Sequence, residues 1–125
     1  MFAALTRLFR KSPAGNSPGP VWVDVADLRA RLAGEEPLVL DVRGPDEFAG
    51  PLGHIEGALN IPLAELAARH AELAGTGRPI VCVCLTDKRS ATAATQLAAA
   101  GVGEVSVLRG GMKAWREAGI SRDLK

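Results

Sequence analysis

The segment IVCVCLTDKRS, residues 80–90, leads straight into an alanine-rich stretch that ends at Gly101. Residues 80–83 are uninterruptedly apolar, which is typical of a strand covered on both faces of a parallel sheet. The polar residues after them predict a tight loop, and Ser90 to Ala100 has the pattern of a helix that Gly101 ends. A buried strand, a loop and a helix in this order predict an α/β domain.

The same alternation of strand and helix continues along the chain. We predict further strands over residues 21–23, 38–40, 58–61 and 105–108. Further helices are predicted after Asp24 or Asp27 up to Gly34, over residues 63–73, and over residues 112–118, which Gly119 would end. This order implies three layers, with a central, mainly parallel five-stranded sheet and helices on both faces. Ligands of such sheets bind beyond the carboxyl ends of the strands.

The composition of the chain favours one globular domain and argues against several classes of protein. It has 125 residues, of which 47% are hydrophobic and 23% charged, so a core can form without disulfides or a structural metal. A net charge of +1 and an aromatic content of 4% argue against a nucleic-acid partner. Two cysteines are too few for a secreted disulfide scaffold, so we expect a reducing compartment and a cytoplasmic location.

Residues 1–20 differ in composition from the rest of the chain and contain no acidic side chain. Residues 1–12 place basic and apolar side chains at the spacings of a short basic amphipathic helix. Residues 12–20 are rich in Pro, Gly and Ser, which indicates a linker, so the domain is expected at residues 21–125. Three roles stay open for the segment: a packing or frayed helix, a transit peptide, or weak contact with an anionic membrane surface.

Cys84 follows the predicted strand 80–83 and therefore stands at the ligand-binding edge of the sheet. The amides of the loop and of the first helical turn have no partners within the helix, so they can converge on an anion. Lys88 and Arg89 add two positive charges, and such surroundings lower the pKa of a thiol. Two interpretations remain open from the local sequence: Cys84 is a nucleophile, or it is a buried structural cysteine.

The second cysteine, Cys82, is two residues from Cys84. Their Cα atoms would lie about 6.6 Å apart in an extended strand, which is near the upper limit for a disulfide. A bridge between them would be strained, so we interpret Cys82 as a small core residue.

Four stretches resemble, in the right order, the signatures of the rhodanese (sulfurtransferase) family. They are Asp41-Val42-Arg43 with Glu47-Phe48, Gly53 to Pro62, Cys84 to Ser90, and Arg109 to Trp115 followed by Gly119. Single-domain members of the family commonly show Cys, four intervening residues, Arg and then Ser or Thr, as this chain does. The stretches run from Asp41 to Gly119, most of the chain after the linker, so the resemblance implies a rhodanese-like domain over residues 21–125.

The resemblance implies a thiosulfate sulfurtransferase that works through a cysteine persulfide. Cys84 would take the outer sulfur of thiosulfate or another sulfane donor and release sulfite. A thiophilic acceptor, cyanide or a thiol, would then remove the sulfur. The loop would bind the donor through Leu85, Thr86, Asp87, Lys88, Arg89 and Ser90. No metal or organic cofactor is implied.

Three alternatives to this activity are weighed. Cysteine phosphatases of this fold place five residues between nucleophile and arginine, whereas Cys84 and Arg89 have four between them, which disfavours a phosphatase. A non-catalytic rhodanese-like module that binds or regulates a partner stays open. A carrier that passes persulfide sulfur to a partner protein stays open as well.

Asp87 departs from the family pattern, which most often has Gly at this position. Aspartate tolerates a positive φ better than most residues, so the loop could keep its shape. Its carboxylate would oppose thiolate formation and oxyanion binding. We therefore predict that thiosulfate turnover is low and that Asp87→Gly raises it.

The other marked residues have structural interpretations. Asp41 and Arg43 could touch substrate at the end of a strand, but we favour an ion-pair network, open to Glu47 as a third member, that supports the neighbouring loops. His54 lies between the turn residues Gly53 and Gly57 and is interpreted as a hydrogen-bonded turn residue.

Overall fold

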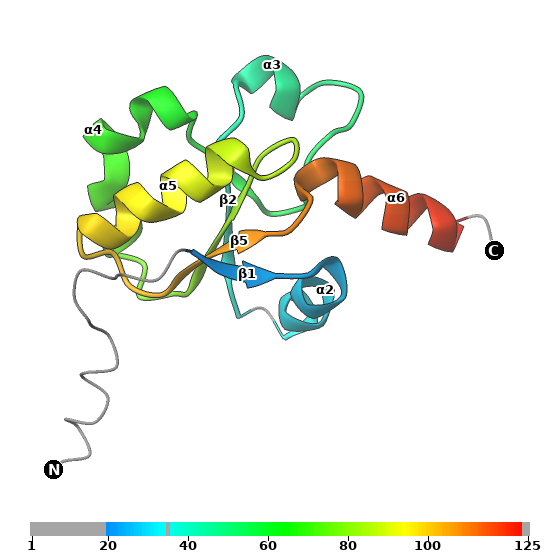
Figure 1. The fold of residues 1–125 in the computed structure, drawn as a ribbon, viewed down its shortest axis with the longest axis horizontal. Coiled ribbons are helices and arrows are strands. Elements are labelled where there is room, and N and C mark those ends of the chain that lie inside the picture. The colour runs from blue at the N-terminus through cyan, green and yellow to red at the C-terminus, as the bar shows by residue number, and fades with distance from the viewer. Residues whose placement is uncertain (1–19, 35, 124–125) are drawn as a thin grey trace, which may run out of the picture.

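Residues 20–34 and 36–123 are described by the computed structural model, which places a parallel sheet between two layers of helices (Figure 1). The strands are β1 (Val21–Val23), β2 (Leu38–Asp41), β3 (Leu59–Asn60), β4 (Ile80–Val83) and β5 (Val105–Leu108). The helices are α2 (Val25–Ala33), α3 (Pro45–Phe48), α4 (Leu63–Ala74), α5 (Lys88–Ala99) and α6 (Gly111–Asp123). The predicted α/β class with a five-stranded sheet is confirmed.

The strand order is β1-β5-β4-β2-β3, and every neighbouring pair is parallel. β4 lies at the centre with all four residues buried, which explains its uninterrupted apolar sequence. β2 pairs with β4 so that Asp41 lies opposite Val83. The segments that follow these two strands therefore emerge side by side at one edge of the sheet.

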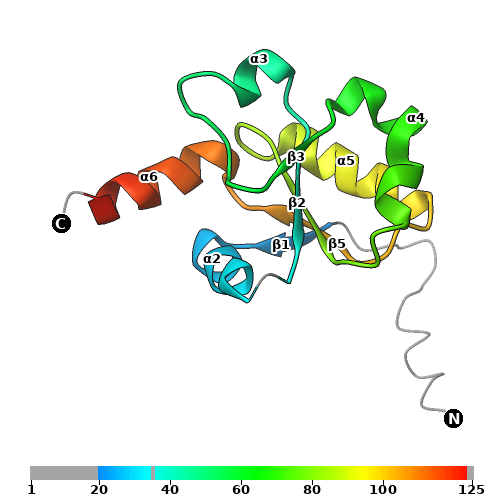
Figure 2. The same cartoon turned by 180° about the vertical axis from the view of Figure 1, so that it is seen from behind.

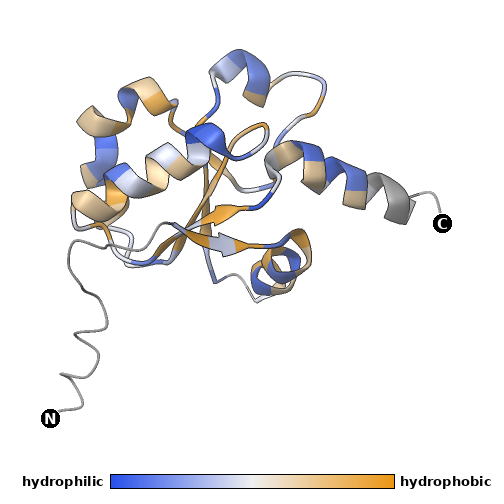
Figure 3. Ribbon diagram, viewed as in Figure 1, coloured by the Kyte–Doolittle hydropathy of each residue, from blue (hydrophilic) through white to orange (hydrophobic). Residues whose placement is uncertain are grey.

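Helices cover both faces of the sheet, and Figures 1 and 2 show the two layers from opposite sides. Leu40 and Cys82 pack on one face with residues of α4 and α5. Val39 and Val81 pack on the other face with residues of α2 and α6. Successive residues of a strand point to opposite faces, so the apolar run of each central strand supplies both halves of the core. In Figure 3 β5 is coloured as hydrophobic and the first turn of α5 as hydrophilic.

Two helices differ from the sequence-based prediction in their ends. α5 begins at Lys88 rather than Ser90, and Asp87 takes its N-cap position. α6 continues through Gly119 to Asp123 instead of ending at Ala118. A glycine inside a helix costs only about 1 kcal/mol relative to alanine, so it does not by itself end one.

The short helix α3 is an element that the sequence analysis did not predict. Its first residue is Pro45, whose fixed φ suits the start of a helix. Glu47 accepts a hydrogen bond from the backbone N–H of Gly44 at 3.1 Å and so caps the same turn. α3 thereby places Glu47 beside the sheet edge where β2 and β4 end.

The basic segment and linker predicted for residues 1–20 lie outside the described residues, apart from Pro20. Among the helices that are described, none has the length and apolar character needed to cross a membrane.

Candidate active site

Cys84 lies directly after β4, and its thiol faces the start of α5. Its side chain is only 1% exposed. The backbone N–H of Ser90 donates to Sγ of Cys84 at 3.3 Å, and Oγ of the same serine lies 3.3 Å from that sulfur. The N-terminus of a helix carries partial positive charge, and here it faces the sulfur. Of the predicted loop residues, Ser90 is thus the one in direct contact with the sulfur.

The first turn of α6 holds the loop that follows Cys84. The backbone N–H of Met112 donates to the carbonyl of Cys84 at 2.9 Å, and that of Lys113 donates to the carbonyl of Leu85 at 3.1 Å. In a trans peptide the C=O and the following N–H point in opposite directions. The amides of Leu85 and Thr86 therefore point away from α6. They are two of the donors that the loop can offer to an anion.

Gly110 and Gly111 allow α6 to approach the loop this closely. Gly111 has a φ of +58°, and a Cβ atom built there would lie 2.6 Å from the carbonyl oxygen of Leu85 and closer still to those of Cys84 and Thr86. Only glycine fits such a contact. Both glycines belong to a family signature, but their contact with the thiol loop was not predicted from the sequence.

Asp87 stands at the N-cap position of α5, but its side chain makes no cap hydrogen bond there and contacts the turn before α6 instead. One carboxylate oxygen of Asp87 accepts a hydrogen bond from the backbone N–H of Gly110 at 3.3 Å. Its φ is −151°, so the left-handed conformation considered for this position is not adopted. The carboxylate remains beside the loop, where the predicted effect of Asp87→Gly on thiosulfate turnover can be tested.

Arg89 forms a bidentate ion pair with Glu47, a partner that the sequence analysis did not assign to it. The two guanidinium nitrogens lie 2.7 and 2.9 Å from the two carboxylate oxygens. Glu47 therefore does not join Asp41 and Arg43 in one network, because α3 directs it toward Arg89 in the thiol loop. The pairing also raises the pKa of Arg89, which keeps its positive charge.

The carboxyl group of Glu47 should titrate near pH 2. The hydrogen bonds from Arg89 lower its pKa from 4.5 to about 2. Because the folded pKa is the lower one, the pair stabilises the fold above about pH 4.5 and this contribution is lost as the pH falls toward 2. An NMR titration of the side-chain carboxyl carbon should show this midpoint, and Arg89→Gln should return it to the ordinary range. An unchanged midpoint in Arg89→Gln would contradict the assigned cause.

Asp41 and Arg43 form a buried ion pair of their own, and each side chain is 1% exposed. Nε and one terminal nitrogen of Arg43 donate to the carboxylate of Asp41 at 2.9 and 2.8 Å, and the same terminal nitrogen donates to the carbonyl of Gly53 at 2.7 Å. Asn60 donates to the carbonyls of Asp41 and Arg43. The pair therefore ties the end of β2 to the turn at Gly53.

Three other predicted residues lie farther from the sulfur or on the surface. Thr86 and Lys88 are exposed on the outside of the loop. Nδ1 of His54 donates to the carbonyl of Phe48 at 2.9 Å, and the rings of His54 and Phe48 are stacked. This hydrogen bond to a backbone carbonyl agrees with the interpretation of His54 as a hydrogen-bonded turn residue.

Cys82 lies in the core on the same sheet face as Cys84. Burial, and to a smaller extent Cys84, raises the pKa of its thiol to about 12. Both cysteines are free thiols. The interpretation of Cys82 as a small core residue is confirmed by its complete burial.

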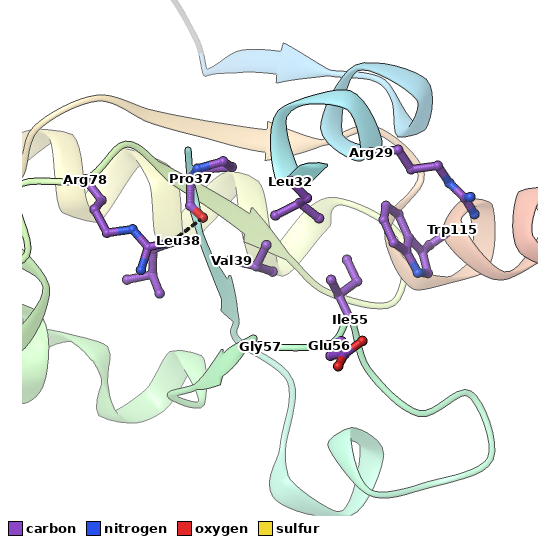
Figure 4. A pocket seen from close by; sticks show the side chains of 10 residues that line it. All are labelled: Arg29, Leu32, Pro37, Leu38, Val39, Ile55, Glu56, Gly57, Arg78 and Trp115. Atoms are coloured by element: carbon purple, nitrogen blue, oxygen red, sulfur yellow. Dashed lines mark hydrogen bonds between the residues drawn. The ribbon is translucent and has the colours of Figure 1, made fainter. Parts of the chain in front are cut away.

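A cavity of about 790 Å³ lies apart from the thiol loop (Figure 4). It runs along β2 from Arg78, which donates to the carbonyl of Pro37, to Trp115 of α6. Its lining includes no residue from 84 to 90. The chemistry expected of the thiol therefore does not use this cavity.

Comparison with known proteins identifies the family. The model of the family described as "Rhodanese-like domain" matches residues 24–118. The chain belongs to the rhodanese-like domain family. The residues matched include the whole thiol loop, Glu47 and the Gly110-Gly111 pair.

Relatives of this rhodanese-like domain are found among curated proteins and solved structures. "Uncharacterized protein YqhL" of Bacillus subtilis is 44% identical over 62% of this chain and 59% of that protein. A protein of Allochromatium vinosum named "Sulfurtransferase" is 36% identical over 78% of this chain and 90% of its own length. The crystal structure of a rhodanese-related protein from Thermoplasma volcanium has 30% identity and a TM-score of 0.71, covering 79% of this chain and 93% of that one. The rhodanese-like chain spans 41% to 59% of the length of the first three curated relatives.

Proposed function

We propose that this rhodanese-like domain is a sulfurtransferase that moves a sulfane sulfur from thiosulfate or a related donor to a thiophilic acceptor through a persulfide on Cys84. The observation that carries the proposal is the position of the Cys84 sulfur, 3.3 Å from the backbone nitrogen of Ser90 at the start of α5. The relative named "Sulfurtransferase", whose length the match covers almost completely, supports it. A free thiol nucleophile requires a reducing compartment, so the proposal includes a cytoplasmic location.

The transfer takes place in two nucleophilic steps. The Cys84 thiolate attacks the outer sulfur of thiosulfate, a new S–S bond forms, and the old S–S bond breaks as sulfite leaves with its electron pair. Cys84 then carries an anionic persulfide. Cyanide or a thiolate attacks the terminal sulfur, takes it as thiocyanate or a new persulfide, and leaves the Cys84 thiolate. No proton shuttle or net oxidation is required.

The loop supplies the electrostatics of both steps. The amides of Leu85, Thr86 and Ser90 are available to an anionic sulfur, and preorganised backbone donors stabilise such charge without reorganisation. Lys88 offers a point charge to an oxyanion donor, and Arg89 offers the N–H groups that Glu47 does not occupy.

Intact-mass spectrometry after incubation with thiosulfate tests the proposal. The wild-type protein should gain the mass of one sulfur atom, and cyanide should remove it. Cys84→Ser should gain nothing. The matched control is Cys82→Ala, which removes the only other cysteine of the chain and should load sulfur as the wild type does. If no sulfane donor adds sulfur to the wild type, the enzyme proposal is wrong and a binding module becomes the better interpretation.

The same experiment distinguishes an enzyme from a protein-to-protein carrier. Sulfur that is loaded and then released to cyanide or a small thiol identifies a turnover enzyme. Sulfur that is loaded but leaves only when a protein acceptor is added identifies a carrier. We expect release to cyanide, because Cys84 follows β4 at the carboxyl edge of the sheet, in a loop that reaches solvent at Thr86 and Lys88.

A further inference from the structure

Two carboxylates and two cations surround the thiol loop. Glu47 holds Arg89 at 2.7 and 2.9 Å, and Asp87 precedes Lys88 at the start of α5. The formal charge of these four side chains is therefore zero. The loop offers its amides to a sulfur atom without an excess of positive charge around them.

Glu47 reduces what Arg89 can offer to an anionic donor. A bidentate pair uses two N–H groups of the guanidinium and sets a negative charge directly against it. Glu47 stays ionised throughout the physiological pH range, because Arg89 lowers its pKa to about 2. A donor oxyanion must share or displace this carboxylate.

Asp87 acts from the other side of the loop. The Asp87 carboxylate accepts a hydrogen bond from the N–H of Gly110, beside the N-terminus of α6. This contact weakens the electric field of the carboxylate at the loop, but the carboxylate keeps its negative charge. Lys88 is exposed, so water and salt screen its charge more strongly. The electrostatic potential near the loop amides is thus less favourable to anions than the presence of Lys88 and Arg89 in the sequence indicates.

We infer that Glu47 and Asp87 make the loop select sulfane donors of low charge, namely persulfides of small thiols, over dianionic thiosulfate. This inference rests on the proposed function, since it names the donor class of the same site. The repulsion between a carboxylate and a donor scales with the donor's charge. It is greatest for a dianion, smaller for a persulfide, which carries at most one negative charge, and absent for the protonated form R–S–SH that reacts.

The reaction with a thiol persulfide, R–S–SH, balances without another reactant. The Cys84 thiolate attacks the terminal sulfur, forms the Sγ–S bond and breaks the donor S–S bond. The thiolate R–S⁻ leaves with the electron pair, and the proton stays on the transferred sulfur. The leaving group is a monoanion, and the four charged side chains around the loop have no net charge that would retain it.

The test compares the rates at which Cys84 gains sulfur from two donors, dianionic thiosulfate and the persulfide of 2-mercaptoethanol, which carries at most one negative charge. The proteins are the wild type, Glu47→Gln, Asp87→Asn and Asp87→Gly. Each variant should raise the thiosulfate rate relative to the persulfide rate by on the order of tenfold. Asp87→Asn keeps a side-chain oxygen for the N–H of Gly110, so it separates the charge from the hydrogen bond. Glu104→Gln, which removes one negative charge at the opposite edge of the sheet, should leave the ratio unchanged.

The outcomes of this test are distinct from those of the proposed function. An unchanged ratio in Glu47→Gln and Asp87→Asn overturns the inference while leaving the sulfurtransferase proposal intact. A parallel fall of both rates also overturns it, because the carboxylates would then hold the loop in shape rather than select the donor. A wild type that takes sulfur from neither donor overturns the proposed function itself.

Discussion

Arg43→Ala is expected to lower the free energy of unfolding by about 3–5 kcal/mol, the usual cost of removing one partner of a buried ion pair. Arg43 and Asp41 are each 1% exposed and lie 2.8 Å apart. The variant leaves the carboxylate of Asp41 buried with no cation, and it leaves the carbonyl of Gly53 without its guanidinium donor. A domain of this size has only about 5–15 kcal/mol in total, so the loss is large.

Urea denaturation followed by circular dichroism measures this effect. Arg69→Ala is the matched control, because Arg69 also pairs with carboxylates but on the exposed surface of α4, and it should leave the midpoint where it is. The double variant Asp41→Ala, Arg43→Ala should lose less than the sum of the single variants, since it leaves no unpaired buried charge. An Arg43→Ala variant as stable as the control would show that the pair contributes nothing to the fold.

Gly111→Ala is expected to destabilise the domain by about 3 kcal/mol and to slow persulfide formation at Cys84. The new Cβ would lie 2.6 Å from the carbonyl oxygen of Leu85, so the loop and α6 must separate. Separation breaks the hydrogen bonds from Met112 to Cys84 and from Lys113 to Leu85. The amides that face the anion then lose their fixed direction.

Gly101→Ala is the control for the backbone conformation alone. Gly101 also has a left-handed φ, +81°, but nothing lies within 4 Å of a Cβ atom built there. It should cost only about 1–2 kcal/mol, the intrinsic cost of that conformation, and should load sulfur at the wild-type rate. Equal stability and equal loading rates for the two variants would mean that the contact between α6 and the loop has no role.

The strands were predicted well from sequence because their signal is local. Ile80 to Val83 is buried on both faces, so its apolar run follows directly from its place at the centre of the sheet. α3 was missed because a helix of four residues has no hydrophobic period to detect. The end of α6 was predicted too early because Gly119 marks a helix end only where the chain turns away, and here α6 runs on to Asp123.

The candidate site was predicted in part, and the missed part consists of long-range pairs. Cys84, the amide-rich loop and the helix start that faces the sulfur are contiguous in sequence, so one stretch of chain contains them. Glu47 and Arg89 are 42 residues apart, and their pairing depends on how α3 is placed beside the end of β4. No spacing rule within one helix or strand could have shown it.

The sequence by itself determined that an α/β sheet presents a cysteine at its carboxyl edge and that a loop with free backbone N–H groups follows it. Buried strands and helix starts can be predicted in this way because each depends on a short, contiguous pattern of residues. The tertiary structure alone decided how that loop is held and how its charges are balanced. The first turn of α6 donates hydrogen bonds to two loop carbonyls, Glu47 forms an ion pair with Arg89, and Asp87 accepts a hydrogen bond from Gly110. These contacts join segments that only the packing of helices against a shared sheet brings together.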